Sequence, residues 1–291
     1  MNIKQDKGIK TTISMILIYL LMWGGQFTGV NFVPLYVRSL PFSNGMTTGI
    51  VMAAGSLVTI LALPVWGVLA DRAKTKNRVL AVALLGVSAL SWLFIIPRYR
   101  SLSAILAAVA MFYLFFLAPS SLIDTIVVEN IARARLRFSS VKAFASGGAA
   151  LMAFAVFIIS RVYSDIAPEK AFMLMSGCAF LSVFPLCFMP RTSGYARGVS
   201  DQGRVSLKSI LGNKRLILIL AYGLFHFIAV SCVNNFLAIY FVTSDGLNAG
   251  MGMYGLFYAI SIICEALVML IGGKFINRQS PYLIFLIAPI A

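Results

Sequence analysis

Charged side chains are scarce in this sequence. Only 11% of its 291 residues are charged, histidine occurs once, and 60% of the residues are hydrophobic, which gives a mean hydropathy of +0.92. Soluble domains carry about 25% charged residues and roughly 45 to 50% apolar residues. The shortage of charge excludes a soluble globular protein and predicts an all-α integral membrane protein.

Acidic residues and cysteines are also few, and their spacing excludes further classes. The nine acids form no D-x-x-D pair between apolar runs, so a membrane-embedded lipid-linked transferase is only a remote alternative. The longest gap has about 26 residues, too few for the soluble domain of a receptor. The four cysteines lie in apolar runs without CxxC spacing, as packing residues do. We therefore expect no enzymatic activity, no cofactor and no metal.

Long apolar runs, in contrast, are abundant. A helix needs about 20 apolar residues to cross the bilayer core. The first run is too long for a signal peptide and has no small-residue cleavage site, so we expect a retained helix. The last run is interrupted by the chain end, and we expect further helices after it. The predicted spans lie near residues 12–36, 46–70, 79–97, 102–127, 139–160, 171–189, 216–242 and 250–273, with a ninth beginning near 281.

Lysine and arginine are distributed unevenly between these gaps. The N-terminus and every second gap after it hold nineteen of the 24 basic residues, and the alternate gaps hold five. Because cytoplasmic loops are enriched in Lys and Arg, we expect the N-terminus in the cytoplasm and the protein in the cytoplasmic (inner) membrane. A nucleic-acid binder would gather its cations on one face of a soluble domain, so no nucleic acid is expected.

The chain also contains a weak internal repeat. The stretch "NFVPLYVRSL" begins at Asn31 and "NFLAIYFVTS" begins at Asn235, and the pattern G-x-x-x-[DN]-R follows each of them. Both copies begin at a cytoplasmic end, which predicts parallel repeats of six helices. The expected organisation is an N-terminal bundle (1–189), a cytoplasmic linker (190–215) and a partial C-terminal bundle (216–291).

The stretch "GVLADRAKTKNRVL", which begins at Gly67, resembles the signature loop between helices 2 and 3 of the major facilitator superfamily. The resemblance covers essentially the whole chain. It implies the major facilitator fold of two six-helix bundles, with about eight and a half of twelve helices present and a substrate site near the midplane. We expect Asp71 to cap or ion-pair with a neighbouring helix end, as a latch within a gating loop. The residues of that loop are Gly67, Asp71, Arg72, Lys76, Gly273 and Arg278.

A narrower resemblance covers the fourth and fifth spans. The stretch "APSSLIDTIVVENIARARLRFSSVKAFASGG" is similar to lactose-permease-like and nucleoside-symporter-like members, in which an acid closes helix 4 and a basic, glycine-containing motif opens helix 5. On that motif, Asp124 is the acid and Lys142 the cation, and the resemblance implies that they hold substrate hydroxyls. Lys142 replaces an arginine and Ala149 a stacking tryptophan, which disfavours a galactoside.

Other polar residues within the predicted spans are also candidates, because ionisable groups in a bilayer persist mainly where they face a cavity or a partner. Glu265 is expected near the midplane, as a substrate contact or proton carrier, and His226 is a second possible proton carrier. Glu129, which has three arginines nearby, is interpreted as a solvated loop charge. The amides expected to contact substrate are Gln26, Asn31, Asn234 and Asn235.

Together these features predict a secondary transporter, a proton symporter for a sugar or a nucleoside that works by alternating access. Efflux of drugs or metabolites by proton antiport is the alternative within the same superfamily. The expected partners are the small-molecule solute, protons and the lipid bilayer. We expect the protein to be a monomer.

Overall fold

The computed structural model describes residues 3–95, 99–134, 138–163, 168–194, 212–244 and 246–276. Within these ranges the secondary structure is entirely helical. Eight segments of these described ranges are long and apolar enough to cross a membrane, and they agree in position with the first eight predicted spans. The ninth predicted span, near residue 281, lies outside the described residues. The chain is therefore a multi-pass membrane protein.

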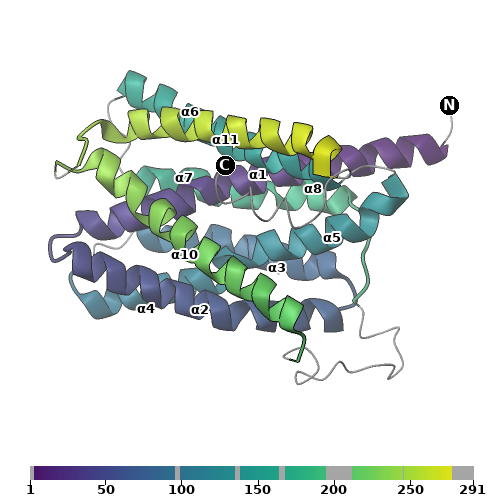
Figure 1. Cartoon of the computed structure of the whole chain (residues 1–291), viewed down its shortest axis with the longest axis horizontal. Helices are drawn as coiled ribbons and strands as arrows, with labels where there is room; N and C mark the ends of the chain where they lie inside the picture. The colour runs from purple at the N-terminus through teal and green to yellow at the C-terminus, as the bar shows by residue number, and fades with distance from the viewer. Residues whose placement is uncertain are drawn as a thin grey trace.

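The helices follow one another along the chain, with short connections from α1 to α8 and with residues 189–213 between α8 and α10 (Figure 1). Their bounds are α1 Ile3–Ser39, α2 Gly45–Arg72, α3 Lys76–Leu90, the short 3₁₀ helix η1 Ser91–Phe94, α4 Leu102–Phe116, α5 Ala118–Ala134, α6 Phe138–Tyr163, α7 Pro168–Leu181, α8 Val183–Phe188, α10 Lys214–Val242 and α11 Gly250–Ile276.

Two of the predicted spans are each divided into two helices next to a proline. The fourth span is α4 followed by α5, with Pro119 in the first turn of α5, and the sixth is α7 followed by α8, with Pro185 in the first turn of α8. Proline has no amide hydrogen for the carbonyl four residues earlier, so a helix tends to stop and restart there.

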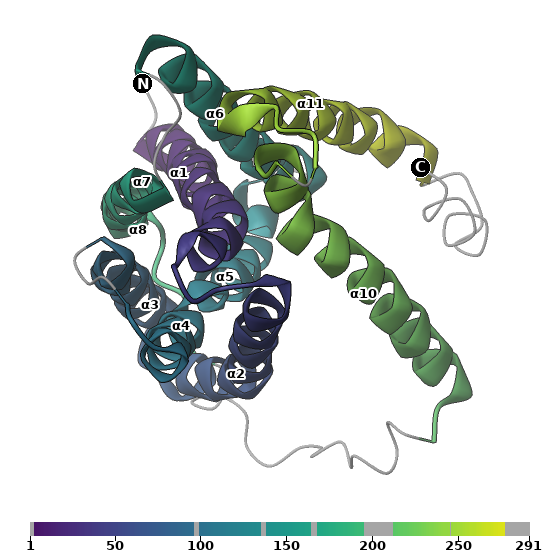
Figure 2. The same ribbon diagram turned by 90° about the vertical axis from the view of Figure 1, so that its left-hand side faces the viewer.

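Helix α1 lies among the first-half helices and contacts most of them (Figure 2). Its approach to α6 depends on glycine: a Cβ on Gly148 would lie 2.1 Å from the carbonyl oxygen of Leu20, a distance that no side chain tolerates. Small residues at such a crossing let two membrane helices pack backbone to backbone. The close approach brings the first turns of α6 against α1 and α5, where Lys142 and Asp124 lie.

Helices α10 and α11 pack on one side of this first bundle, α10 against α1 and α11 along α6 (Figure 2). Their contacts concentrate where α10 ends and α11 begins: Ala238, Met251 and Tyr254 are buried there. Toward the opposite end, long stretches of both helices are exposed, including Leu224 and Ile263. The second half therefore meets the first half at one end, which we call the closed end, and separates from it toward the other, the open end.

Candidate functional site

Asp124 and Lys142 form the charged centre of the site. The Lys142 Nζ atom lies 2.6 Å from Asp124 Oδ2, and the two side chains are 29% and 31% exposed. Lys142 also lies over the ring of Phe138, 5.4 Å from its centroid, one helical turn earlier on α6. Both side chains are thus partly exposed, so a ligand can reach the pair.

Tyr19 completes this centre from a third helix. Its hydroxyl donates a hydrogen bond of 2.6 Å to Asp124 Oδ1, and its side chain is fully buried. One carboxylate oxygen therefore faces Tyr19 and the other faces Lys142, so the charged centre ties together α1, α5 and α6. Sequence reasoning missed Tyr19, because nothing in an apolar run indicates which tyrosine will meet an acid 105 positions later.

Asn31 does not lie in an open site. It is fully buried at the closed end, where its Nδ2 donates to the carbonyl of Phe27 at 2.7 Å and its Oδ1 accepts a hydrogen bond from the Tyr254 hydroxyl of α11. Phe27 contacts the ring of Tyr258 at 4.8 Å between centroids. In this arrangement both ends of the Asn31 amide are occupied by protein, and its contact is with the other half of the molecule.

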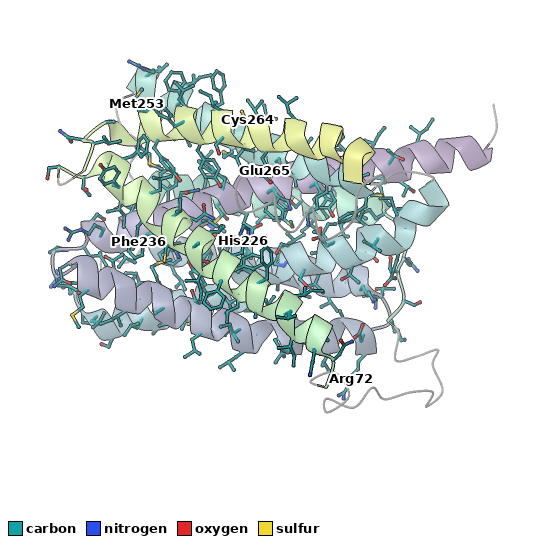
Figure 3. The ribbon with its side chains drawn as sticks, in the orientation of Figure 1. Arg72, His226, Phe236, Met253, Cys264 and Glu265 are labelled. Atoms are coloured by element: carbon teal, nitrogen blue, oxygen red, sulfur yellow. The ribbon has the colours of Figure 1, made fainter. Side chains whose placement is uncertain are left out.

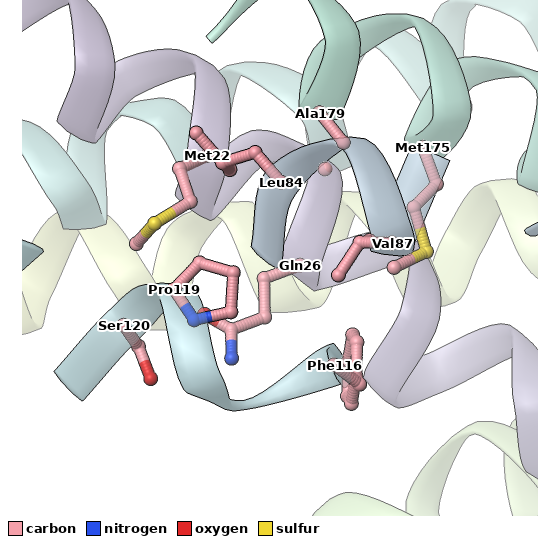
Figure 4. Close-up of a pocket in the computed structure, with 10 residues that line it drawn as sticks. Met22, Gln26, Leu84, Val87, Phe116, Pro119, Ser120, Met175 and Ala179 are labelled. Atoms are coloured by element: carbon pink, nitrogen blue, oxygen red, sulfur yellow. The ribbon is translucent and has the colours of Figure 1, made fainter. Parts of the chain in front are cut away.

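Gln26 points into a small pocket within the first half (Figure 4). The pocket is bounded by helices of that half alone, and its lining is apolar except for Gln26 and Ser120. The Gln26 Oε1 atom is buried and has no hydrogen-bond partner among the described residues. The pocket begins one turn before Asp124 on α5, so Gln26 adjoins the charged centre without contacting it.

On α10 the predicted site residues are more open. Asn234 and Asn235 are half-buried. His226 is exposed, with its ring parallel to that of Tyr222 at 6.1 Å. Asn235 and its repeat mate Asn31 both lie near the closed-end terminus of their helix, yet only Asn31 is enclosed.

Glu265 lies on the face of α11 that is directed toward the first half (Figure 3). It follows Tyr254 by eleven residues, and three turns of helix take about 10.8 residues, so the two share a face. Tyr254 and Tyr258 on that face contact α1, whereas Glu265 is exposed because the halves have separated at its position.

The depth of Glu265 matches that of the charged centre. Measured from the Asn31–Tyr254 contact toward the open end, Glu265 lies about 17 Å along α11 and Tyr19 about 18 Å along α1, at about 1.5 Å per residue. Carboxylates of the two halves, Asp124 and Glu265, are thus set at similar depth on either side of the separating space.

The predicted gating loop contains a second lysine–carboxylate pair. Lys76, the first residue of α3, is buried, and its Nζ lies 2.6 Å from Glu129 Oε1 and 3.8 Å from Asp71 Oδ1. The interpretation of Glu129 as a solvated loop charge is wrong, because it is the closer partner of a buried cation. The sequence contained a signal for this role. Glu129 is an acid that comes just after the fourth predicted span, and the basic residues of that gap all come after it.

The other members of the gating loop make fewer contacts. Gly67 has open space around its α-carbon, and Arg72 is exposed at the end of α2 (Figure 3). Gly273 lies within α11. Arg278 lies outside the described residues. The contacts of this loop are therefore concentrated on Lys76.

The beginning of the predicted linker is fastened over the same loop. The Thr192 carbonyl accepts from the Lys76 amide at 2.8 Å, the Thr192 amide donates to Asn77 Oδ1 at 3.0 Å, and the Thr192 hydroxyl accepts from Asn130 Nδ2 at 2.9 Å. A Cβ on Gly194 would lie 2.1 Å from the Asp71 carbonyl oxygen. Residues 190–194 thus pack as part of the first half.

No group of three or more His, Cys, Asp or Glu side chains with metal-site spacing occurs among the described residues. The chemistry available at the charged centre is hydrogen bonding: an ammonium group donates, and a carboxylate accepts, in a position that is half open to solvent. Such a pair suits a ligand that carries hydroxyl groups.

The chain resembles solved transporter structures over most of its length. It matches the nucleoside transporter NupG (D323A mutant) with a TM-score of 0.73 and 15% sequence identity, over 92% of this chain and 69% of that one. A second NupG structure matches with a TM-score of 0.66 and 16% identity, over 96% of this chain and 68% of that one. These matches show the major facilitator fold.

Comparison of sequences gives a related result. The chain is 24% identical to the lactose permease of Citrobacter freundii over 268 residues, which are 85% of this chain and 62% of the permease, so it spans less than two thirds of that relative. The model of the MFS_1 like family matches residues 12–291. The chain belongs to the MFS_1 like family, within the major facilitator superfamily that its loop motif predicted.

Proposed function

We propose that this protein is a secondary transporter that carries a polar, hydroxyl-bearing solute, a sugar or a nucleoside, through the membrane by alternating access. The observation that carries the proposal is the half-exposed Asp124–Lys142 pair, which a buried tyrosine holds within a bundle of the transporter fold. Lactose permease and NupG are named for solutes of these two kinds, which supports the proposed solute class.

The charge pair fits a hydroxylated solute for a chemical reason. A sugar hydroxyl is both donor and acceptor, so it can accept from the Lys142 ammonium while it donates to the Asp124 carboxylate. Solute binding then exchanges one set of charge-assisted hydrogen bonds for another rather than leaving buried charges unpaired. Lys142 offers a point charge in place of the planar fork of an arginine, which disfavours a galactoside among the possible sugars.

Alternating access in the proposed cycle uses the two ends of the molecule. The Asn31–Tyr254 hydrogen bond and the Phe27–Tyr258 ring contact hold the halves together at the closed end. In the other state these contacts open and the open end closes, with residues 1–194 and 216–291 moving as two bodies joined by the rest of the predicted linker. The Lys and Arg distribution supports an N-terminus in the cytoplasm of the cytoplasmic membrane, so the open end is the cytoplasmic one.

Proton coupling is assigned to Glu265, with His226 as the second candidate. A ligand moves a conformational equilibrium only through different affinities for its two states. Glu265 faces the space between the halves and is exposed in the state with an open cytoplasmic end, so closure of that end would bury it and change its proton affinity. Asn234 and Asn235 are proposed as further solute contacts on α10. Protons and a single small solute are thus the proposed partners of a monomeric protein without a cofactor.

The test is uptake by lipid vesicles that contain the protein, with labelled lactose, other sugars and nucleosides and an imposed pH gradient. We expect accumulation of at least one hydroxylated solute, driven by the gradient. Glu265→Gln should abolish gradient-driven accumulation while it preserves exchange of solute across the membrane. Accumulation by Glu265→Gln at the unmodified rate would remove Glu265 from the coupling step, and absence of uptake of every solute would contradict the proposed function.

A further inference from the structure

The three tryptophans of this chain differ in how their indole groups are bonded. Trp66 Nε1 donates to the carbonyl of Leu114 at 2.7 Å, and Trp92 Nε1 donates to Ser176 Oγ at 3.1 Å. Trp23 Nε1 is buried and has no acceptor among the described residues. Since indole N–H groups in membrane helices normally find an acceptor, Trp23 is the exception that needs an explanation.

Trp23 lies beside the charged centre. It follows Tyr19 by four residues, so it is on the same face of α1, about 6 Å closer to the closed end. Its ring packs against the buried cluster whose members include Tyr19 of α1, Ile123 of α5 and Val141 of α6. These are the three helices that also carry the charged centre of Tyr19, Asp124 and Lys142.

A second unpaired group lies next to it. Gln26 is three residues after Trp23, a spacing at which side chains of a helix are neighbours, and its Oε1 atom is buried and unpartnered among the described residues. Trp23 thus offers a donor and Gln26 an acceptor. A polar group buried without a partner costs free energy, so two of them on one turn of a helix indicate that something else satisfies them.

We propose that Trp23 and Gln26 form a second polar subsite, in which the indole N–H donates to, and the amide carbonyl accepts from, one hydroxyl group of the transported solute. The inference rests on the proposed function and makes it more specific. Asp124 and Lys142 bind one hydroxyl of the solute, and the subsite binds another, closer to the closed end. The ring of Trp23 supplies an apolar face for the solute ring, as expected in a site that combines an aromatic surface with a few polar groups.

The test compares three single substitutions that each remove one indole N–H: Trp23→Phe, Trp66→Phe and Trp92→Phe. Solute affinity is measured with uridine and glucose as probes, and thermal stability is measured in parallel. We expect Trp23→Phe to weaken binding of the probe by about tenfold with little change in Tm, because the substitution breaks no protein hydrogen bond. Trp66→Phe and Trp92→Phe should show the reverse, a lower Tm and an unchanged Kd.

Monodeoxy derivatives of the bound probe give a readout that a purely structural role would not change. One derivative should bind the unmodified protein about tenfold more weakly than its parent, and this difference should vanish in Trp23→Phe and be reduced in Gln26→Leu. In the double variant W66F/W92F, Trp23 is the only tryptophan, and its fluorescence should change when the probe binds.

The outcomes separate this inference from the proposed function. If Trp23→Phe binds the probe and all its deoxy derivatives as the unmodified protein does, the proposed subsite does not exist. Bound water then satisfies Trp23 Nε1 and Gln26 Oε1. In that case Asp124→Asn still loses binding and the proposed function stands. If Asp124→Asn retains full affinity, the proposed function is wrong.

Discussion

Two lysine–carboxylate pairs of the first half have the same length and different surroundings. Lys76–Glu129 and Lys142–Asp124 both measure 2.6 Å between Nζ and the carboxylate oxygen. The side chain of Lys76 is 2% exposed and that of Glu129 21%, whereas both members of the other pair are about 30% exposed. Distance alone therefore does not distinguish a pair that fastens helices from a pair that meets a ligand.

The difference lies in what else each pair contacts. Lys76 is enclosed at the junction of α2, α3 and α5, with Asp71 as a second carboxylate at 3.8 Å and Thr192 bonded to its own backbone amide. Asp124 has one buried tyrosine as a second partner, and its side chain is 31% exposed. Removing one partner of an enclosed pair leaves an uncompensated buried charge, while removing one partner of an open pair leaves a charge that water can solvate.

The largest expected effect follows substitution of the enclosed cation. Lys76→Met leaves Glu129, whose side chain is only 21% exposed, without its partner and should destabilise the protein by about 3 kcal/mol. The measurement is the Tm of the purified protein in detergent and the yield of folded protein. The double variant Lys76→Met with Glu129→Leu is the control, and it should recover most of the loss. If Lys76→Met is as stable as the unmodified protein, the Lys76–Glu129 ion pair does not stabilise the fold.

Substitution of the open cation should affect function rather than stability. Lys142→Met removes the donor that faces the solute, and we expect uptake to fall by about 100-fold. The Tm should change little, because half-exposed ion pairs contribute about 0–1 kcal/mol. Lys142→Arg is the matched control, since it retains the charge and should keep measurable uptake. A Lys142→Met protein that is unstable and yet transports normally would reverse the assignment of the two pairs.

Tyr19 should have an intermediate effect. Tyr19→Phe removes only the hydroxyl that holds Asp124 Oδ1 and should raise the Kd for the solute about fivefold, which corresponds to about 1 kcal/mol. Tyr36→Phe provides a control in a different aromatic cluster of α1, for which we expect no change in Kd. Equal affinities of Tyr19→Phe and the unmodified protein would show that Asp124 needs no orientation by α1.

The smallest effect is expected at Asp71. Its side chain is 52% exposed and lies 3.8 Å from Lys76, which is long for an ion pair. Asp71→Asn should leave the Kd unchanged and slow uptake by roughly twofold to fivefold, as expected for a weak exposed contact near a moving end. Uptake and Kd measured on the same preparation separate the two effects, and a large change in Kd would contradict a gating role.

The positions of the spans were predictable because the bilayer imposes a length and a composition on every one of them. The prolines that divide the fourth and sixth spans were visible in the sequence, and their consequence became clear only in the structure. Asp124 and Lys142 were found through a motif resemblance. The structure shows that they form an ion pair, and the contact with substrate hydroxyls that the resemblance implies stays a prediction.

Residues whose roles depend on a distant partner were not predictable in the same way. Tyr19, Glu129 and Tyr254 each acquire their environment from a helix far away in the sequence. Asn31 and Asn235 illustrate the limit: they are equivalent in the repeat, and only Asn31 is enclosed by the other half. Repeat symmetry fixes the position of a residue along its helix and leaves its partner open.

The central claim is that the partly exposed Lys142–Asp124 pair binds solute and the enclosed Lys76–Glu129 pair does not. Its most direct test is the solute Kd of Asp124→Asn and Glu129→Gln, measured side by side on folded protein with the sugar or nucleoside that gives the highest uptake. We predict that Asp124→Asn raises the Kd by about 100-fold and that Glu129→Gln leaves it within about twofold of the unmodified value while it lowers the Tm. Equal affinities for Asp124→Asn and the unmodified protein, or a loss of affinity confined to Glu129→Gln, would contradict the claim.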